Sequence, residues 1–248
     1  MTEMVTRAER ERLRAFFPDT GDTLMNACLQ GHMGQAAAGA GWAALLAGDF
    51  AFLGGEACRE GLDWLDENKP GLLILSGNAA WLDLAAGYAH RSPERAERYA
   101  FDVPARWDTD RLRALAAAVP SGVEILPMDG AWFAQCRQEE QLYDLCGPFA
   151  DMPAFAAHGA GRVAVRAGRV MAGAGTYAWA DGSIEVEIDT LPAYRRQGLA
   201  TACGAALILD CLDRGLRPHW DAANDTSRRL ALRLGYPPPR PYEVVEWA

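Results

Sequence analysis

The sequence predicts an α/β protein whose sheet has mixed strand directions. Strand and helix patterns alternate along most of its 248 residues, a length that suffices for one large domain or two ordinary ones. Two hairpin-sized turn signals, Arg166-Ala167-Gly168-Arg169 and Asp181-Gly182, join successive apolar strands in the second half. The predicted sheet therefore combines antiparallel hairpins with strands that are connected through helices.

The first 120 residues are predicted to form an N-terminal α/β domain that closes at Pro120-Ser121-Gly122. Its first helix covers residues 6–17, and two short apolar strands flank the turn signal Gly48-Asp49. The elements expected in this half after the first helix are strands over 43–46 and 50–53, a helix over 56–68, a strand over 71–76, a helix over 78–89, a strand over 98–103 and a helix over 108–119.

Residues 121–248 are predicted to form a second domain with a clearer pattern. Gly215 and Gly235 each follow an apolar helical run and mark its C-terminal stop. The expected elements are a strand over 123–128, a helix over 131–145, strands over 161–166, 170–180 and 184–190, a helix over 198–214, a strand over 216–221, a helix over 224–234 and a strand over 242–247.

Composition excludes several classes of function. A formal net charge of −9 and a pI near 5.0 argue against binding to nucleic acid. No run approaches the roughly 18 apolar residues of a membrane helix, and the charged N-terminus does not resemble a secretory signal. The six cysteines form no CxxC pair and lack histidines at zinc-ligand spacing, so we expect a cytoplasmic protein with reduced thiols and no metal.

The segment from Ser183 to Thr201 has the pattern of an anion-binding strand–loop–helix unit. An alternating strand leads through Pro192 and two arginines to Gly198, where a long helix begins. Backbone N–H groups in the first turn of a helix have no partner within the helix, and the helix dipole adds positive potential there. The amides of residues 197–201 are therefore suited to hold a phosphate, and Gly198 lets the backbone approach it closely.

Two motifs in this half resemble those of the GNAT superfamily of acetyl-CoA-dependent N-acetyltransferases. The first is Arg195-Arg196-Gln197-Gly198-Leu199-Ala200, which is similar to the (Q/R)-x-x-G-x-(G/A) loop that binds pyrophosphate. The second is Asn224-x-x-Ser227-x-x-Leu230-x-x-x-Leu234-Gly235-Tyr236, at the expected distance along the chain. Either motif alone is weak evidence, whereas the two in their strand and helix context are specific.

More narrowly, the chain resembles the subfamily of acetyltransferases that confer resistance to the aminopolyol antibiotic zwittermicin. The stretches that carry this resemblance are Leu29-Gln30-Gly31-His32-Met33-Gly34, Gly48-Asp49-Phe50, Glu185-Val186-Glu187-Ile188-Asp189-Thr190, Gly198-Leu199-Ala200-Thr201 and Trp220-Asp221-Ala222-Ala223-Asn224. The resemblance implies a mostly antiparallel sheet flanked by helices in residues 121–248, with the N-terminal domain a candidate degenerate copy of the same fold.

The resemblance also implies that acetyl-CoA is the co-substrate and that a small polar amine accepts the acetyl group, an aminopolyol antibiotic being one candidate. Asn224 and Ser227 would line the pantetheine arm, although either Asn224 or Asp225 is equally suited to cap a helix. A backbone N–H near Thr190 would polarise the thioester oxygen, where Pro192 and its loop separate the strand from its neighbour. The residues expected to bind the co-substrate are Ile188, Thr190, Arg195, Arg196, Gln197, Gly198, Leu199, Ala200, Thr201, Asn224 and Ser227.

The strand over 184–190 presents three carboxylates, Glu185, Glu187 and Asp189, on one face. Such a face must see solvent or a polar cleft, and mutual repulsion is expected to raise the pKa of at least one carboxyl. Amine acetylation needs a base for the ammonium proton. Glu187 matches the superfamily's catalytic position and Glu185 is the second choice, while a solvated strand face without a catalytic role is the alternative.

One position departs from the superfamily pattern. The tyrosine that often protonates the departing thiolate is replaced by Ala231, and neither Tyr194 nor Tyr236 occupies the matching position. This departure favours an alternative function, a non-catalytic acyl-CoA-binding sensor, whereas the acidic strand argues for catalysis. Because no cysteine lies in the transfer segment, direct attack by the amine is expected. A nicotinamide-dependent oxidoreductase is excluded by the lack of a G-x-G-x-x-G turn.

Three other residues are weaker candidates for contact with substrate. His32 and His219 are isolated histidines, which more often have structural roles. Asp221 follows Trp220 at the end of a predicted strand, where its carboxylate could meet a cationic acceptor.

Overall fold

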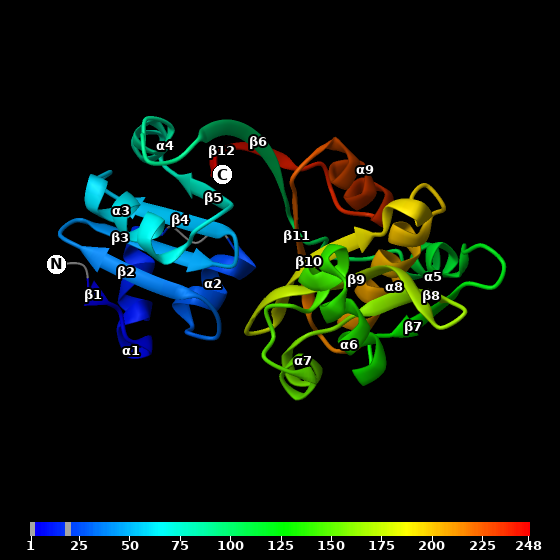
Figure 1. The fold of residues 1–248 in the computed structure, drawn as a ribbon. Coiled ribbons are helices and arrows are strands. Elements are labelled where there is room, and N and C mark those ends of the chain that lie inside the picture. Colours follow the sequence, from blue (N-terminus) through cyan, green and yellow to red (C-terminus); the bar gives the residue numbers. More distant parts are fainter. Residues whose placement is uncertain (1–2, 18–20) are drawn as a thin grey trace. The chain divides into compact units, whose positions relative to one another are not determined.

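A computed structural model describes residues 3–17 and 21–248 (Figure 1). The chain forms two compact units, one made of the residues up to Arg98 together with Pro241–Ala248 and the other made of Tyr99–Arg240. The predicted domain boundary lay after residue 120. The units divide earlier because the helix over 109–117 packs on the long helix of the second unit, and because the last strand pairs within the first unit.

The first unit is built on strands that neighbour one another in the order β1-β2-β3-β4-β5-β12. Neighbours in this order run antiparallel, except that β4 and β5 are parallel. The strands are β1 (Glu3–Met4), β2 (Gln35–Gly39), β3 (Trp42–Ala47), β4 (Phe50–Gly55), β5 (Leu73–Gly77) and β12 (Arg240–Trp247). The helices are α1 (Arg7–Arg10), η1 (Glu11–Phe16), α2 (Thr23–Leu29), α3 (Arg59–Asn68) and α4 (Ala79–Ala86). Trp42, Trp81 and Trp247 are fully buried in its core.

The second unit contains a sheet in the order β6-β11-β10-β9-β8-β7. Its strands pair antiparallel apart from the parallel pair β10 and β11. The strands are β6 (Pro93–Phe101), whose last residues pair with β11, β7 (Glu124–Pro127), β8 (Arg162–Arg166), β9 (Arg169–Ala180), β10 (Ser183–Thr190) and β11 (Arg217–Ala222). The helices are α5 (Thr109–Ala117), α6 (Gly130–Gln138), η2 (Glu140–Leu145), α7 (Met152–His158), η3 (Pro192–Tyr194), α8 (Leu199–Asp213) and α9 (Asp225–Leu234).

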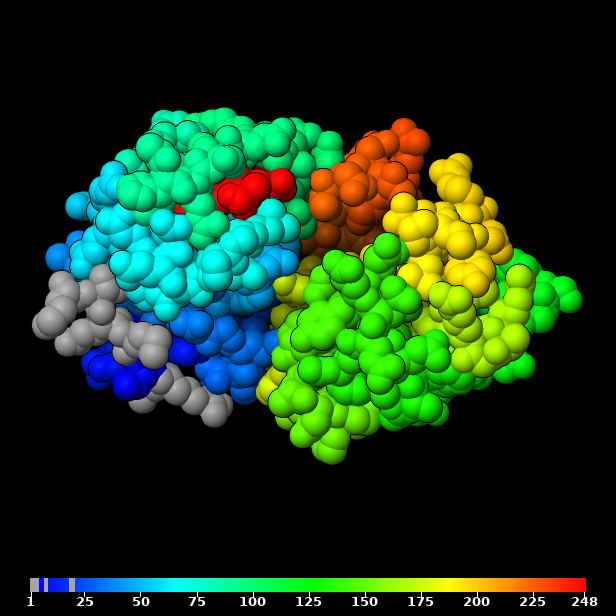
Figure 2. Space-filling view, viewed as in Figure 1, coloured from blue at the N-terminus to red at the C-terminus, as the bar shows by residue number. Residues whose placement is uncertain are grey.

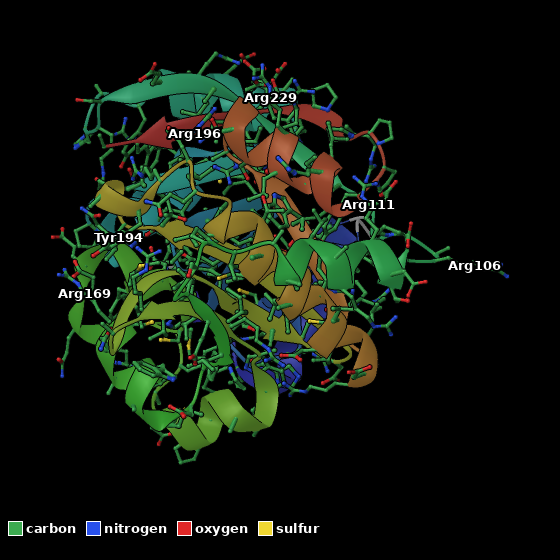
Figure 3. The ribbon with its side chains drawn as sticks, turned by 90° about the vertical axis from the view of Figure 1, so that its right-hand side faces the viewer. Arg106, Arg111, Arg169, Tyr194, Arg196 and Arg229 are labelled. Atoms are coloured by element: carbon green, nitrogen blue, oxygen red, sulfur yellow. The ribbon has the colours of Figure 1, made fainter. Side chains whose placement is uncertain are left out.

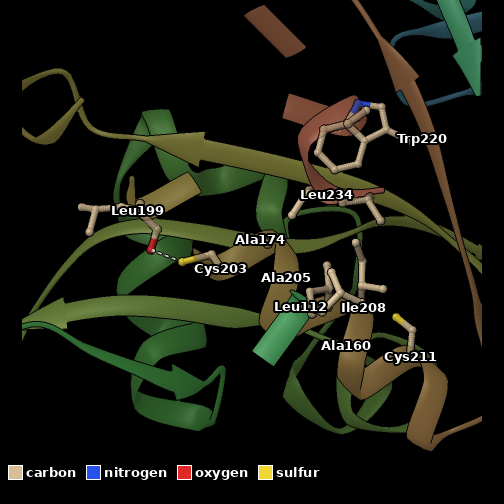
Figure 4. Packing of buried hydrophobic residues seen from close by; sticks show 14 of the residues in the cluster. Leu112, Ala160, Ala174, Leu199, Cys203, Ala205, Ile208, Cys211, Trp220 and Leu234 are labelled. Atoms are coloured by element: carbon tan, nitrogen blue, oxygen red, sulfur yellow. Dashed lines mark hydrogen bonds between the residues drawn. The ribbon is translucent and has the colours of Figure 1, made fainter. Parts of the chain in front are cut away.

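Helix α8 is the centre of the main core of the second unit (Figure 4). Its apolar side chains pack among Leu112 of α5, Ile184 of β10 and Leu234 of α9. Gly204 brings the helix close to the sheet, since a Cβ at this residue would lie 2.9 Å from Cδ1 of Ile188 and 2.9 Å from Cδ1 of Leu234. A separate core, which includes Phe133, Leu145 and Phe155, lies beneath α6, η2 and α7.

The predicted fold class is confirmed, because each sheet is mixed and mostly antiparallel and carries helices. The two units also share one order of elements. Three antiparallel strands are followed by a helix, a strand parallel to the third strand, and a second helix. The first unit therefore repeats the connectivity of the second, as expected for a copy of the same fold.

Several local predictions were incomplete. Helix α2, strand β2 and helix α7 were not predicted, and the helix expected over 131–145 ends at Gln138 and gives way to the 3-10 helix η2. The helix expected over 6–17 is likewise divided into α1 and η1. Among residues 3–17 and 21–248, no helix combines the length and the apolar character needed to cross a membrane.

Candidate active site

The parallel strands β10 and β11 separate part of the way along their length. Their register covers only Ser183↔Arg217, Ile184↔Pro218 and Glu185↔His219, whereas β9 stays paired with β10 as far as Thr190. A bulge in the β9–β10 register lies between Glu185 and Val186, where the separation starts. Pro192 and its loop were expected to separate the two strands, but the separation starts several residues earlier. Residues 186–190 therefore have a sheet edge that β11 does not cover.

The segment after β10 turns into α8 through the residues that were predicted to bind an anion. Arg196 and Gly198 have left-handed backbone angles, with φ of 64° and 82°, and Gly198 is the N-cap of α8. None of the described residues accepts a hydrogen bond from the amides of Leu199, Ala200 or Thr201, and the first bond of the helix runs from the Ala202 amide to the Gly198 carbonyl. The first turn of α8 contains no acidic residue that would repel an anion.

This turn is open to an incoming ligand. The four residues 195–198 are all exposed, and a Cβ at residue 198 would meet only the carbonyl oxygen of Ala118, at 3.7 Å. The backbone angle, and not crowding within the fold, is therefore what requires glycine at residue 198. The space-filling view shows the turn (yellow) at the surface of the second unit, beside the start of α9 (orange) (Figure 2).

Two polar groups lie where the end of β10 meets this turn. The Arg195 side chain donates a hydrogen bond from Nε to the carbonyl oxygen of Thr190, at 3.2 Å. The Thr190 hydroxyl oxygen is buried and has no hydrogen-bond partner within the described part of the chain. A buried hydroxyl without a partner is costly, so a polar ligand along this strand would satisfy it.

Asn224 and Ser227 lie at the start of α9. The Asn224 side chain accepts a hydrogen bond from the Ser227 amide at 3.0 Å and so caps the helix, which confirms the capping interpretation of this motif. The Ser227 hydroxyl accepts a second bond from Nε1 of Trp220 at 3.1 Å. Because β10 and β11 are parallel, the helices that follow them begin at the same end of the sheet, and the two motifs are brought to one edge.

The acidic face of β10 is less open than predicted. Glu185 is only 8% exposed and lies in the part of β10 that still pairs with β11, opposite His219. Glu187 and Asp189 are half-buried, and they lie opposite Gly175 and Gly173 of β9. The 3-10 helix η2 packs on this face, because residues 173 and 175 have no side chains to keep it away.

The titration of Asp189 is shifted by its surroundings. Burial, reinforced by the negative charge of Asp144 in η2, raises the pKa of Asp189 to about 6, and Arg195 acts in the opposite direction. The expected rise of a pKa on this strand is therefore present. Its cause is desolvation and a neighbour from another element, and not repulsion along the strand. The Glu187 carboxylate accepts a hydrogen bond from the Ile188 amide at 3.1 Å.

No tyrosine occupies the position of the usual general acid. Ala231 is fully buried, and the hydroxyl group of Tyr236 donates to the carbonyl oxygen of Pro218 at 2.9 Å inside the core. Burial raises the pKa of Tyr236 well above its ordinary value. Tyr236 packs against Trp107 and Trp220, so its role is structural (Figure 4 shows Trp220 in this core).

The two candidate histidines lie in different units. His32 follows α2 in the first unit, whereas the site residues described above belong to the second unit. His219 lies on β11, where burial and Arg217 lower its pKa to about 4 despite the opposing effect of Asp102. Its Nε2 atom is buried without a hydrogen-bond partner among the described residues. Asp221 is half-buried two residues further along β11.

The buried cysteine thiols are poor nucleophiles. Five of the six free cysteines are buried, and desolvation raises their pKa values to about 11 for Cys146 and about 12 for the other four. The described part of the chain holds no group of three or more His, Cys, Asp or Glu side chains able to bind a metal ion.

The most important residue that the sequence did not reveal is Asp144, because only the packing of η2 brings it to Asp189. The alternation of Gly173 and Gly175 within a strand was an available signal, since glycines in a strand interior mark a close approach of another backbone. The hydrogen bond from the Trp220 indole to the Ser227 hydroxyl was also not predicted.

Comparison with known proteins identifies this arrangement. The sequence matches a family model described as GNAT acetyltransferase over residues 14–245. It is 36% identical to a GCN5-related N-acetyltransferase-like protein from Streptococcus suis 89/1591, over 98% of this chain and 100% of that one, and the structures agree with a TM-score of 0.90. No curated protein matches the sequence.

Two more distant structures share the fold. A GCN5-related N-acetyltransferase from Sphaerobacter thermophilus is 12% identical with a TM-score of 0.61, covering 100% of this chain and 95% of its own. A tandem GNAT protein from the clavulanic acid biosynthesis pathway is 14% identical with a TM-score of 0.56, and the match covers 100% of this chain and 98% of that one. Both matches extend over the two units of this chain.

Proposed function

The chain belongs to the GNAT acetyltransferase family, and from this premise we propose that it transfers an acetyl group from acetyl-CoA to the amine of a small polar acceptor. The observation that carries the proposal is the separation of β10 from β11 beside the open first turn of α8. Both features lie in the second unit, and together they offer a phosphate site next to an uncovered strand edge.

The residues of the turn fit an acyl-CoA. Its pyrophosphate would be held by the amides of residues 197–201, with Arg195 and Arg196 adding positive charge. Ile188 and Thr190 lie on the uncovered stretch of β10, where the buried Thr190 hydroxyl can bond a polar group of the pantetheine arm. Asn224 and Ser227 complete the site from the start of α9. When bound, acetyl-CoA supplies the activated acetyl group.

The described residues of the first unit do not offer a second site of this kind. Its parallel strands β4 and β5 stay paired as far as Leu53↔Gly77, close to the end of β4. The end of β4 is closely packed, because a Cβ at Gly54 would lie 2.6 Å from the carbonyl oxygen of Phe16 and one at Gly55 would lie 2.2 Å from that of Gly41. We therefore propose one acetyl-CoA site per chain, in the second unit.

The chemistry of the chain favours direct attack by the amine. An acyl-enzyme would need a reactive thiolate, and the buried cysteines have raised pKa values. Glu187, with Glu185 as second choice, was predicted to act as the base. The buried position of Glu185 in the closed part of the sheet leaves Glu187 as the better of the two. The acceptor would be a cationic amine, and an aminopolyol antibiotic is a candidate.

A cofactor titration and a thiol-release assay test this function. Calorimetry should give one CoA bound per chain, and saturating CoA should raise the midpoint of thermal unfolding. Release of free thiol from acetyl-CoA should then accelerate with at least one member of a panel of polyamines, aminoglycosides, amino acids and aminopolyols. The absence of CoA binding would contradict the proposed function, because the transfer reaction requires the co-substrate.

A non-catalytic acyl-CoA sensor is the second candidate, and Ala231 is the observation in its favour. In that case CoA would bind with the same stoichiometry, while no amine in the panel would increase thiol release. A thiolate is already a fair leaving group, so the lack of a tyrosine acid does not by itself prevent catalysis.

A further inference from the structure

Each unit repeats the same connectivity, and each repeat continues into one further strand. The first copy runs from β2 to α4 and continues into β6, and the second copy runs from β8 to α9 and continues into β12. The strands β6 and β12 therefore hold equivalent places along the chain. Successive strands usually lie side by side, so a self-contained copy would pair β6 with β5 and β12 with β11.

The observed partners are the opposite ones. Strand β6 pairs antiparallel with β11 through Tyr99↔Ala222, Ala100↔Asp221 and Phe101↔Trp220. Strand β12 pairs antiparallel with β5 through Val245↔Leu75, Glu246↔Ile74 and Trp247↔Leu73. Accordingly, β6 begins in the first unit and ends in the second, whereas Pro241–Ala248 belong to the first unit. The two copies have swapped their last strands.

Aromatic side chains fix the end of β6 in the second unit. Phe101 is 5% exposed and packs in the main core of this unit, with its ring centroid 5.8 Å from that of Tyr236. Tyr99 lies on the same face of β6, and the guanidinium carbon of Arg228 in α9 is 5.5 Å from its ring centroid. The core of the second unit is therefore completed by residues of the first copy.

Trp247 fixes β12 in the first unit in a comparable way. It is fully buried, its ring stacks on that of Tyr88 with the centroids 4.8 Å apart, and its Nε1 atom donates to the carbonyl oxygen of Ala85 at 3.1 Å. Each swapped strand is thus anchored in the core of its unit, so the swap is part of the fold and not a surface contact.

The two swapped strands pair with different parts of β5 and β11. Strand β12 pairs with the first three residues of β5, and two of these, Ile74 and Leu75, are also paired with β4. Strand β6 pairs with the last three residues of β11, whereas β10 pairs with the first three. Strand β11 therefore changes its partner between His219 and Trp220, which is where β10 loses the cover of β11.

This difference in register accounts for the open edge of β10. Paired strands stay about 4.8 Å apart, so β11 must follow β6 from Trp220 onward and can leave β10 only where it has joined β6. Releasing β6 would expose the buried Phe101, which opposes a return of β11 to β10. In the first unit β5 is held from both sides along the same residues, and β4 stays covered.

We propose that the first copy is a structural partner of the acyl-CoA site, because its strand β6 holds the end of β11 away from β10 and so keeps the edge of residues 186–190 open for the co-substrate. This inference rests on the proposed function for the identity of the ligand, whereas the strand swap is independent of it. Disturbing β6 should impair the site although the residues expected to bind CoA are unchanged.

Two matched proline variants of the full chain test the swap. Proline lacks an N–H group and does not fit a paired strand. Ala100 and Glu246 are both half-buried, and each is the middle residue of its three paired residues. In hydrogen–deuterium exchange without ligand, Ala100→Pro should reduce the protection of residues 220–222, and Glu246→Pro should reduce that of residues 73–75. Each substitution thus acts on the strand of the other copy.

Calorimetric titration with CoA tests the role of β6 in the site. Ala100→Pro should raise the Kd by about tenfold or more, since only a minor fraction of the molecules would keep the open edge. Glu246→Pro is the matched control and should keep the wild-type Kd, because it disturbs the sheet of the first unit. An equal rise in both variants would indicate general destabilisation and contradict the role of β6.

Phe101→Ala is the second variant, for the case that Ala100→Pro does not fold. It keeps the backbone of β6 and removes the buried anchor, so it should reduce the protection of residues 220–222 more than that of residues 73–75 and should raise the Kd for CoA. Full protection of residues 220–222 in this variant would overturn the proposal.

The outcomes separate this inference from the proposed function. Loss of protection within the same copy, at residues 73–75 in Ala100→Pro and at residues 220–222 in Glu246→Pro, overturns the swap. Crossed loss of protection with an unchanged Kd in Ala100→Pro overturns the role of β6 in the site. A wild type that binds no CoA contradicts the proposed function and the role of β6, while hydrogen–deuterium exchange still decides the swap. Crossed loss with a higher Kd in Ala100→Pro alone establishes the proposal.

Discussion

Gly175 of β9 lies directly beneath the backbone of Leu145, so that a Cβ at residue 175 would be 1.9 Å from the Leu145 carbonyl oxygen. This contact seats η2 on the acidic face of β10, because Gly175 is the cross-strand partner of Glu187. Two glycines in β9 thus allow η2 to pack on the face of the sheet that carries Glu187 and Asp189.

We expect Gly175→Ala to destabilise the second unit and to displace η2. The new methyl group cannot be accommodated by a rotamer change, since the obstacle is backbone, and the cost should reach the upper end of the roughly 1–3 kcal/mol typical of overpacking. Urea unfolding measures the loss. Gly130→Ala is the control, because a Cβ there meets nothing within 4 Å, and an equal effect of both substitutions would contradict the role of the contact.

Arg196→Ala should weaken CoA binding without changing stability. Alanine keeps the same Cβ at the same left-handed φ, so the only change is the loss of an exposed positive charge at the turn. One exposed ion pair is worth up to about 1 kcal/mol, which corresponds to a roughly fivefold higher Kd. Calorimetry at two salt concentrations should show that the difference shrinks at high salt.

Arg106→Ala supplies the comparison for Arg196→Ala. Arg106 is also an exposed arginine of the second unit, and Figure 3 shows it far from Arg196 in this view. Its substitution should leave the Kd for CoA unchanged. Equal weakening by the two variants would indicate a general effect of net charge and not a phosphate contact at the turn.

Asn224→Asp separates the two roles of the residue at the start of α9. An aspartate keeps the side-chain oxygen that accepts from the Ser227 amide, and its charge suits a helix N-terminus. Stability should therefore be retained, whereas Asn224→Ala should lose about 1 kcal/mol. If the amide also contacts the pantetheine arm, CoA should bind more weakly to Asn224→Asp; an unchanged Kd would restrict Asn224 to capping.

The strands and helices of the second unit could largely be predicted because their signals are local. Alternating apolar residues define β10, and Gly215 ends the long helix after Asp213. Helix α7 was missed although Asp151 caps it, since its seven residues are too few for a clear period. Strand β2 was missed because its alanine and glycine residues give little contrast between faces, and helix α2 was missed because its seven residues are too few for a clear period.

The candidate site likewise has one part that could be predicted from the sequence and one part that could not. The turn from Arg195 to Thr201 could be predicted, because consecutive residues create it. The neighbour of Asp189 could not, since Asp144 is 45 positions away and only the packing of Leu145 on Gly173 brings the two carboxylates together. The start of the strand separation at Glu185 is likewise a property of the pairing between β10 and β11, which no local pattern specifies.

His219 should make the folded state sensitive to acid. Its pKa is about 4 in the folded protein, whereas the ordinary value of a histidine is 6.5, so the unfolded chain binds more protons between these values. The neutral His219 therefore costs no stability above pH 6.5. As the pH falls from 6.5 toward 4, the free energy of unfolding should decrease by up to about 3 kcal/mol because of this residue. The raised pKa of Asp189 gives the opposite slope, so the contribution of His219 must be taken as the difference between wild type and His219→Gln.

Urea unfolding at several pH values measures this difference between wild type and His219→Gln. Wild type should lose stability relative to the variant across the window between pH 6.5 and 4, because only wild type carries an imidazole that must stay neutral inside the fold. The exposed His90 provides the control, as His90→Gln should follow wild type. Parallel curves for wild type and His219→Gln would contradict the prediction, since they would mean that burial on β11 does not oppose protonation of the ring.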